Sequence, residues 1–326
     1  MFSRLIVLAL LLAAALPAAA FDLQGHRGAR GLAPENTLPA FAAALSLGVT
    51  TLELDIAITR DGVPVISHDP LLNPDFTRGP DGAYLTQRGP AIRSLSLAEL
   101  QRYDIGRIRP GSRYAAQFPD QKPVDGTRFP RLADLFALVR RSGNLSVRFD
   151  IETKVSPLAP DETLAPEPFA RALVAAIRDG GMASRSTIQS FDWRTLRLVQ
   201  QEAPEIGTVY LSAQQRWLDN IGADSAAASP WTAGLKFADH GSVPKMIHAA
   251  GGRIWGVHFG DLSAASLAEA HALGLTVLPW TVNEPAQIAR MIDMGVDGII
   301  SDRPDRVRAE MQRRGLPLPA ATPVQP

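Results

Sequence analysis

The sequence of 326 residues contains no cysteine. This absence excludes disulfide bonds, thiolate catalysis and metal sites with cysteine ligands. The chain also lacks an excess of charge of one sign, because 33 basic residues balance 33 acidic residues. Such a balance argues against a nucleic-acid partner, which usually selects a basic face. Any metal ion in this protein must therefore be held by oxygen or imidazole ligands.

Long hydrophobic runs are absent except near the start, where Leu5–Leu16 is continuously apolar. Arg4 precedes this run, and Pro17–Ala20 follows it with small residues suited to cleavage. The pattern is typical of a secretory signal peptide, and the run is shorter than the roughly 20 residues that a membrane helix needs. An uncleaved N-terminal anchor is the alternative. We expect residues 1–20 to be a signal peptide, the mature chain to have no integral membrane segment, and the protein to be periplasmic if its source is Gram-negative.

Beyond residue 20 the sequence repeats a predicted strand followed by a predicted helix. The eight predicted strands are Phe21–Gly25, Thr50–Ile58, Leu145–Thr153, Ser186–Ser190, Ile206–Leu211, Arg253–His258, Thr276–Thr281 and Gly298–Ser301. Eight such units indicate an α/β fold of the (β/α)8 TIM-barrel type. A doubly wound sheet is the alternative, but its glycine-rich nucleotide loop is missing. We expect the barrel to span residues 21–314.

Three regions depart from this alternation. Residues 70–130 are rich in proline, glycine and arginine and are too long for a simple loop, which predicts an insertion after the second strand region. Residues 212–251 contain short helical pieces that we expect to form one wall of a cleft. The proline-rich residues 315–326 predict a disordered tail.

Acidic residues alternate along the second predicted strand, which puts Glu53 and Asp55 on one face. Carboxylates on a buried parallel strand need a neutralising partner. Glu152 on the third strand completes a set of three carboxylates that suits one divalent cation, Ca²⁺ or Mg²⁺. Lys154 shares its face and is placed to meet an anion, although a Lys–Glu ion pair without a ligand is the alternative. Asp150 lies deeper and is expected to be a supporting group.

Two histidines lie beside this acidic cluster: His26 follows the first predicted strand, and His68 follows the short segment Val63–Ser67, into which Asp61-Gly62 turns the chain after the second strand. Imidazole titrates near neutral pH, so the two are a candidate acid–base pair. Arg27 lies in a glycine-rich bend after the first strand, where its guanidinium can reach a phosphate oxygen.

Other residues near strand ends are candidates for substrate binding. Gln189 ends the fourth strand, whereas Trp280 and Asn283 lie at the end of the seventh. They are expected to line the pocket with an aromatic wall and polar tips, and core packing is the alternative for Trp280. Asn36 precedes the first helix and could serve either as a helix cap or in the site.

Several short motifs occur in a fixed order along the chain. They are His26-Arg27-Gly28, Pro34-Glu35-Asn36-Thr37, Glu53-Leu54-Asp55, Ser67-His68-Asp69, Ile151-Glu152-Thr153-Lys154, Trp280-Thr281-Val282-Asn283 and Gly298-Ile299-Ile300-Ser301-Asp302-Arg303-Pro304. Together they resemble the glycerophosphodiester phosphodiesterase family, in its bacterial periplasmic branch, over almost the whole mature chain. The resemblance implies a TIM barrel that hydrolyses small-molecule glycerophosphodiesters to glycerol 3-phosphate and an alcohol.

The resemblance also implies roles for the candidate residues. The two histidines would be the catalysts, and our assignment makes His26 the base and His68 the acid. The nucleophile is either water or the glycerol 2-hydroxyl. One Ca²⁺ or Mg²⁺ ion would be held by Glu53, Asp55 and Glu152. Arg27 and Lys154 match the family's phosphate contacts.

Two other functions are compatible with the same motifs. Relatives that act as phosphatidylinositol phospholipase C or sphingomyelinase D share the barrel, the paired histidines and the acidic metal site, which would imply cleavage of (lyso)phospholipids. A non-catalytic phosphoester-binding protein is the other alternative. The sequence leaves the preferred alcohol and the oligomeric state open.

Overall fold

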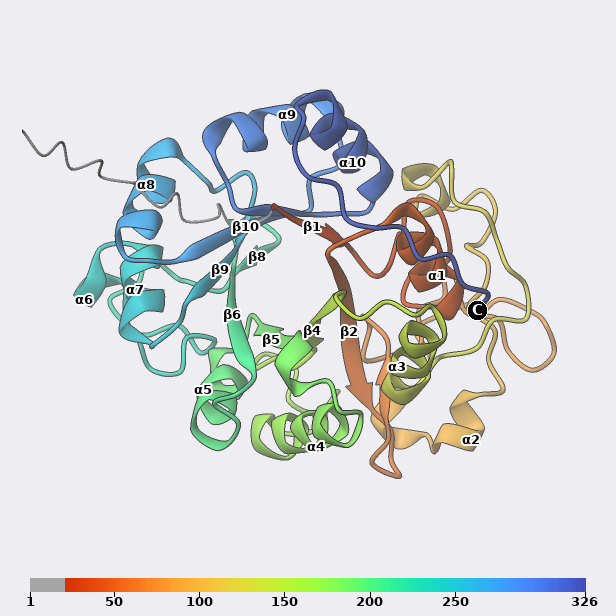
Figure 1. Ribbon diagram of the computed structural model, residues 1–326. Coiled ribbons are helices and arrows are strands. Elements are labelled where there is room, and N and C mark those ends of the chain that lie inside the picture. The colour runs from red at the N-terminus through yellow and green to blue at the C-terminus, as the bar shows by residue number, and fades with distance from the viewer. Residues whose placement is uncertain (1–20) are drawn as a thin grey trace, which may run out of the picture.

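The computed structural model describes residues 21–326, so the predicted signal peptide lies outside the described residues. Its centre is a barrel of parallel strands surrounded by a ring of helices (Figure 1). In spatial order the parallel strands are β10 (Thr276–Trp280), β9 (Ile254–His258), β6 (Gly207–Ser212), β5 (Ser186–Ser190), β4 (Arg148–Thr153), β2 (Thr51–Ile58), β1 (Asp22–Gly25) and β11 (Gly298–Ser301). These are the eight predicted strands, with shifts of a few residues at some ends. The predicted TIM barrel is confirmed.

The two ends of this order come together and nearly close the barrel. The Val282 N–H donates to the carbonyl of Ile300 at 3.0 Å, and the Asp297 N–H donates to the carbonyl of Val277 at 3.2 Å. All eight strands run parallel, so their carboxyl ends meet at one mouth. Active sites of TIM barrels form at that mouth.

The outer ring consists of one helix after each barrel strand. These helices are α1 (Leu38–Leu47), α3 (Leu132–Arg141), α4 (Pro166–Asp179), α5 (Trp193–Glu202), α7 (Val243–Ala249), α8 (Ala264–Ala272), α9 (Pro285–Met294) and α10 (Pro304–Arg313). Each turns apolar residues toward the strands, and the rings of Phe136 in α3 and Phe149 in β4 pack edge to face at 5.0 Å. The β1–α1 loop packs tightly on α1, because a Cβ on Gly28 (φ +85°) would lie 2.7 Å from the Ala40 backbone.

The predicted insertion follows β3 (Pro64–Ile66), which pairs antiparallel with β2. It contains η1 (Ile92–Ser94), α2 (Leu97–Leu100) and η2 (Ala115–Gln117). Its apolar side chains form a small core of their own, which includes Leu72, Phe76, Ile92, Leu100, Ile105 and Phe129. The remaining elements lie between β6 and α7: the hairpin β7 (Gln214–Gln215) and β8 (Leu218–Asp219), and α6 (Phe237–His240).

The C-terminal segment, residues 315–326, for which the composition predicts a disordered tail, makes several contacts with the barrel helices. It runs across the face of the molecule seen in Figure 1 toward α1 and α3. The Thr322 N–H donates to the carbonyl of Leu45 at 2.9 Å, and the Asn144 amide donates to the Thr322 hydroxyl at 3.1 Å. Arg308 in α10 donates to the carbonyl of Pro319 at 2.8 Å. Proline lacks an N–H but keeps its carbonyl, so a proline-rich segment can still be held by its neighbours.

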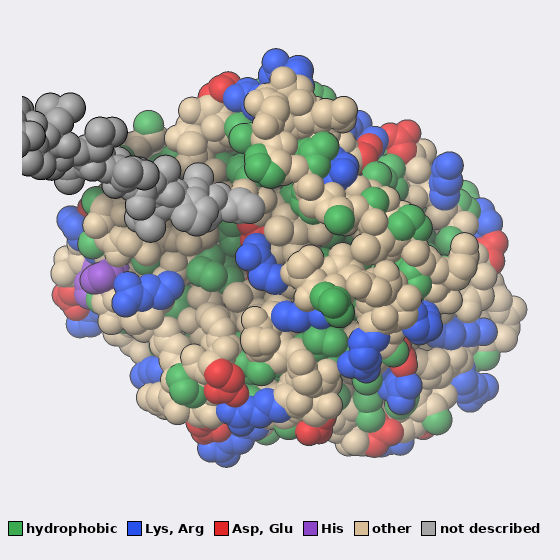
Figure 2. Space-filling model, viewed as in Figure 1, with side chains coloured by type: hydrophobic (Ala, Val, Ile, Leu, Met, Phe, Trp, Pro, Cys, Tyr) green, Lys and Arg blue, Asp and Glu red, His purple; other side chains and the backbone are tan. Residues whose placement is uncertain are grey.

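Positive and negative side chains are interspersed over the same face in the space-filling view (Figure 2). Among residues 21–326, no helix combines the length and the apolar character that crossing a bilayer requires.

Candidate active site

A cavity of about 510 Å³ opens at the carboxyl ends of the barrel strands. Eight of the ten residues predicted for the site line it: His26, Arg27, Glu53, His68, Glu152, Lys154, Gln189 and Trp280. Of the other two, Asp55 is buried beside the lining carboxylates, whereas Asn283 does not line the cavity.

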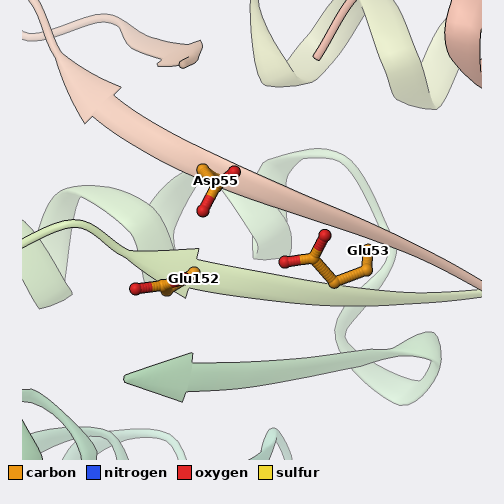
Figure 3. Close-up of side chains that lie close together, drawn as sticks. All are labelled: Glu53, Asp55 and Glu152. Carbon is orange, nitrogen blue, oxygen red and sulfur yellow. The ribbon is translucent and has the colours of Figure 1, made fainter. Parts of the chain in front are cut away.

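Three carboxylates from two neighbouring strands converge at this cavity (Figure 3). Glu53 and Asp55 alternate along β2 and therefore share a face, and β4 pairs with β2 so that Glu152 lies opposite Asp55. One oxygen from each carboxylate lies within 4.8 Å of the others. Within residues 21–326 this is the only such group of three that could hold one metal ion.

Hydrogen-bond donors on neighbouring residues orient Glu53 and Asp55 but leave one oxygen of Asp55 without a partner. Glu53 accepts hydrogen bonds from the Arg27 backbone N–H at 2.8 Å and from the Gln189 amide at 2.6 Å. Asp55 Oδ2 accepts a hydrogen bond from the Asn36 amide at 2.9 Å. Asp55 Oδ1 is buried and has no hydrogen-bond partner. Such an oxygen is costly to bury without a close ligand, and the Lys154 ammonium, 3.6 Å away, lies beyond hydrogen-bond distance.

The charge balance also fits a divalent cation. Lys154 Nζ lies 2.9 Å from Glu152 Oε1 and 3.6 Å from Asp55 Oδ1, so the Lys–Glu ion pair is present beside the cluster. Burial and the nearby Asp55 charge raise the pKa of Glu53. Burial, partly opposed by Lys154, raises the pKa of Glu152 to about 7. Lys154 and Arg27, which Glu35 also binds, do not neutralise three buried carboxylates, whereas a hard cation with oxygen ligands would.

His26 is held by an aspartate from the opposite end of the chain. Its Nδ1 lies 2.6 Å from Asp302 Oδ1, and Asp302 also accepts hydrogen bonds from Arg30 at 2.8 and 3.1 Å and from the Asn283 amide at 2.8 Å. Although burial opposes it, the charges of Arg30 and His26 keep the pKa of Asp302 low, so this carboxylate is ionised. An ionised carboxylate only accepts hydrogen bonds, so Nδ1 carries the proton and Nε2 is left with a free lone pair. Nε2 lies 3.9 Å from Glu53 Oε2.

Burial lowers the pKa of His26 to about 4, although Asp302 opposes this shift. The ring is therefore neutral at pH 7. A neutral imidazole with a fixed tautomer and a free Nε2 can accept a proton.

His68 follows β3, which pairs with β2, and therefore lies near Asp55 on the cavity wall. Its Nδ1 is 3.4 Å from Asp69 Oδ1, and 31% of its side chain is exposed. Burial and the cations Arg27 and Lys154 lower its pKa. The protonated ring is thus a stronger acid than free imidazolium.

The insertion contributes to the placement of Arg27. Arg27 Nη1 donates to Glu35 Oε1 at 2.7 Å, and Arg27 Nε lies 3.4 Å from Asp55 Oδ2. The other oxygen of Glu35 accepts a hydrogen bond from the hydroxyl of Tyr114, which belongs to the insertion. Arg30 also donates to this hydroxyl, at 3.4 Å. The insertion therefore helps to fix two cations at the cavity.

The remaining candidates have distinct surroundings. Gln189 lines the cavity while donating to Glu53, and Trp280 is half-buried in the cavity wall. Asn283 was expected to contact substrate, but its side-chain oxygen accepts hydrogen bonds from Ser301 and Asp302 and its amide nitrogen donates to Asp302. Asp150 accepts a hydrogen bond from Thr187 at 2.8 Å and lies outside the three-carboxylate group.

Sequence reasoning assigned no place in the site to four residues that surround it, although Glu35 was considered as a helix cap. They are Arg30, Glu35, Tyr114 and Asp302. Asp302 carried a usable signal, because it follows the eighth strand and therefore emerges at the same rim as His26. No such signal marks Tyr114, because no local pattern in the insertion indicates where the chain folds back toward the site.

Comparisons with known proteins agree with this geometry. The model of the glycerophosphoryl diester phosphodiesterase family matches residues 26–306. A glycerophosphodiester phosphodiesterase of Caldanaerobacter subterraneus subsp. tengcongensis is 28% identical over 282 residues, which cover 86% of this chain and 93% of the relative.

Solved structures show the same fold. A crystal structure from Silicibacter pomeroyi assigned to this family is 36% identical and superposes with a TM-score of 0.82 over 92% of this chain and 96% of its own. A phosphodiesterase of Oleispira antarctica, solved with its product sn-glycerol-3-phosphate, is 21% identical. Its TM-score is 0.63, with 89% of this chain and 96% of that chain covered.

Proposed function

Because the chain belongs to the glycerophosphoryl diester phosphodiesterase family, we propose that it hydrolyses glycerophosphodiesters to glycerol 3-phosphate and an alcohol, using a divalent cation and two histidines. The observation that carries this proposal is the convergence of Glu53, Asp55 and Glu152 in a cavity that both His26 and His68 line. A phosphodiester is anionic and has a poor leaving group, so it needs charge stabilisation and two proton transfers.

The three carboxylates would hold Ca²⁺ or Mg²⁺. When bound, such an ion supplies Lewis-acid polarisation of a nonbridging phosphate oxygen. Gln189 and Asn36 orient two of the ligands through hydrogen bonds to Glu53 and Asp55. Lys154 and Arg27 contribute positive charge at the cavity wall.

His26 acts as the general base in this proposal. Its Nε2 takes the proton of the attacking hydroxyl, while Asp302 holds Nδ1–H and stabilises the imidazolium that forms. The same transfer serves either nucleophile, water or the glycerol 2-hydroxyl. With the 2-hydroxyl, a cyclic phosphate forms first and water then opens it.

His68 acts as the general acid. As the bond between phosphorus and the alcohol oxygen breaks, His68 gives its proton to that oxygen, so the oxygen leaves as a hydroxyl group and not as an alkoxide. Its lowered pKa makes the protonated ring a stronger acid, although it also lowers the fraction of His68 that is protonated at neutral pH. Its greater exposure suits a group that meets the departing alcohol at the open side of the cavity.

The test is release of glycerol 3-phosphate from a glycerophosphodiester by the purified mature chain, measured with a coupled assay. His26→Ala and His68→Ala should each abolish turnover while the protein stays folded and still binds the metal. Glu53→Ala should lose metal-dependent turnover because one of three ligands is gone. Wild-type activity in either histidine variant would contradict the acid–base assignment.

Parallel assays should distinguish the rival activities. We expect the glycerophosphodiester to be cleaved and a lysophospholipid to be a poor substrate. Preferred cleavage of the lysophospholipid would favour the phospholipase-like alternative, and calorimetric binding of the glycerophosphodiester without product would favour a binding protein.

We also propose export to the periplasm, because residues 1–20 have the composition of a signal peptide. N-terminal sequencing of the protein recovered from the periplasmic fraction should begin near Phe21. A product that retains Met1 in the cytoplasmic fraction would contradict this proposal.

A further inference from the structure

A second cavity lies at the opposite end of the barrel from the candidate active site. Its volume is about 380 Å³, and residues at the amino ends of the strands line it, among them Asp22, Thr51, Arg148 and Thr276. It shares no lining residue with the cavity that holds the histidines. Because layers of branched apolar side chains usually fill the interior of a TIM barrel, a cavity at this end departs from the usual packing.

One side of this second cavity is polar. Gln24 in β1, Asp150 in β4 and Thr187 in β5 alternate with core residues and therefore point into the barrel interior. Gln24 and Thr187 line the cavity, and the Thr187 hydroxyl donates to Asp150 Oδ1 at 2.8 Å. Gln24 is 2% exposed and Asp150 is fully buried. The fold therefore holds this polar side away from bulk water.

Two buried acceptor oxygens on the polar side have no donor. Within residues 21–326, neither Gln24 Oε1 nor Asp150 Oδ2 has a hydrogen-bond partner. The amide nitrogen of Gln24 is already engaged, because it donates to Asp22 Oδ2 at 3.0 Å. Buried acceptors without donors are costly, so the two oxygens indicate a ligand that brings its own N–H or O–H groups.

The basic residues at this cavity are engaged elsewhere. Arg148 lies 2.9 Å from Asp22 Oδ1, and Arg185 donates to the carbonyl of Val147 at 2.8 Å. In the part of the chain that the structure describes, no ion pair joins Asp150 to a basic side chain. The Asp150 carboxylate is therefore open to a cation from outside the chain.

The other side of the second cavity is apolar. In the cyclic strand order β6 lies across the barrel from β1, and β10 lies across from β4. Val209, Ile254 and Leu278, from β6, β9 and β10, line the cavity on this side. Water placed against these side chains would find few hydrogen-bond partners, whereas an alkyl chain would be stabilised by burial. The cavity thus suits a ligand with one polar end and one apolar end.

We propose that this second cavity binds a primary alkylammonium ion, a molecule with one NH₃⁺ group and a short unbranched alkyl chain. The NH₃⁺ group carries three donors, which meet Asp150 Oδ2 and Gln24 Oε1, and its positive charge offsets the buried carboxylate. The alkyl chain lies against Val209, Ile254 and Leu278. A neutral alcohol lacks the charge, and a quaternary ammonium lacks the donors. This site is separate from the proposed phosphodiesterase function and does not depend on it.

The experiment measures butylammonium binding to the purified mature chain by calorimetry, with excess Mg²⁺ so that the amine does not compete for the acidic cluster. At about pH 8.5 the alkylammonium keeps its proton, and Asp150, whose pKa burial raises to about 7, is ionised. We expect one ion per chain and a Tm that rises with ligand concentration. Butan-1-ol and tetramethylammonium should each bind about tenfold more weakly or worse. Methylammonium should lose about three- to fourfold in affinity for each methylene that it lacks.

Variants assign the binding to this cavity. Asp150→Asn keeps the shape of the side chain but replaces one oxygen by an NH₂ group, and it should weaken butylammonium binding about tenfold or more. Gln24→Met removes the second acceptor and should weaken binding several-fold. The matched control is Asp293→Asn, because Asp293 is an exposed carboxylate in α9 that does not line the cavity. This control and Glu53→Gln, in the candidate active site, should leave the affinity unchanged.

The outcomes separate this cavity from the active site. A butylammonium affinity that a folded Asp150→Asn or Gln24→Met variant leaves unchanged would overturn the proposal. Loss of binding in Glu53→Gln would place the amine in the acidic cluster and would also overturn it. Absence of binding to the wild type at millimolar concentrations would show that water alone fills the cavity, with the same consequence. None of these results bears on glycerol 3-phosphate release, so the proposed phosphodiesterase function would stand.

Discussion

The substitution Asp302→Asn tests whether Asp302 fixes the tautomer and the pKa of His26. Asp302 accepts four hydrogen bonds, from His26, from two nitrogens of Arg30 and from Asn283. An asparagine side chain has only one acceptor atom, so its NH₂ group must face donors on one side. If the asparagine oxygen takes the place of Oδ2, where it accepts from Arg30 Nη2 and Asn283, the NH₂ group takes the place of Oδ1 and faces His26 Nδ1 and Arg30 Nε, so the ring must move its proton to Nε2. The base then loses its free lone pair.

The expected changes in kcat, in the pKa of His26 and in the free energy of unfolding follow from these contacts. Loss of the correct tautomer and of the charge that stabilises the imidazolium should lower kcat by about 10²–10⁴-fold. Because Asp302 raises the pKa of His26, the variant should also shift this pKa below its value of about 4. The buried Arg30 loses part of its partner, which should lower the free energy of unfolding by about 1–3 kcal/mol.

The assay measures kcat and the unfolding midpoint, and an NMR titration follows the His26 ring. The matched control is Asp305→Asn, since Asp305 is also a carboxylate near the start of α10 but pairs with Arg303. It should leave kcat unchanged. An Asp302→Asn variant that folds, keeps wild-type kcat and leaves the His26 pKa in place would refute the reasoning.

Three further predictions address the metal, the insertion and the C-terminal segment. In the metal-free protein the pKa of Glu152 is raised from 4.5 to about 7, so between these two pH values the folded chain binds a proton that the unfolded chain has released. The free energy of unfolding should therefore fall as pH rises from about 4.5 to about 7. Because a bound cation displaces this proton, calorimetry should show proton release, the cation affinity should rise as pH rises through about 7, and the cation should raise Tm more at high pH than at low pH. A cation affinity that does not depend on pH would contradict this prediction. Tyr114→Phe removes the hydroxyl that binds the buried Glu35 and should lower both kcat/KM, by about tenfold, and Tm, by a few degrees, whereas Tyr103→Phe, in the same insertion, should change neither. Removing residues 317–326 should lower Tm by about 2–4 °C, because the Leu45 and Asn144 contacts are lost, and should leave kcat unchanged; an unaltered Tm would show that the segment adds no stability.

The barrel and the metal cluster could be predicted because both follow from local patterns. Two carboxylates that alternate on one strand must share a face, and a third on a neighbouring parallel strand can meet them. Glu53, Asp55 and Glu152 satisfy this condition, and their placement needs only the strand order.

The support around the site depends on contacts between distant parts of the chain. Asp302 and His26 are 276 residues apart, and Tyr114 and Glu35 are 79 residues apart within different structural units. Local hydrophobic periodicity predicts elements but not where an irregular insertion folds back. The contacts of the C-terminal segment could not be predicted for a similar reason, because its composition does not indicate that a carbonyl such as that of Pro319 accepts a hydrogen bond from Arg308.

The most direct test of the account is release of glycerol 3-phosphate by the purified mature chain before chelation, after chelation and after addition of Ca²⁺ or Mg²⁺, with bound metal counted at each stage. We predict that turnover disappears with the ion and returns when one ion per chain is restored. The Glu53→Ala variant should recover neither the ion nor turnover. Full turnover by a chain shown to be free of metal would contradict the central claim that Glu53, Asp55 and Glu152 form a catalytic metal site.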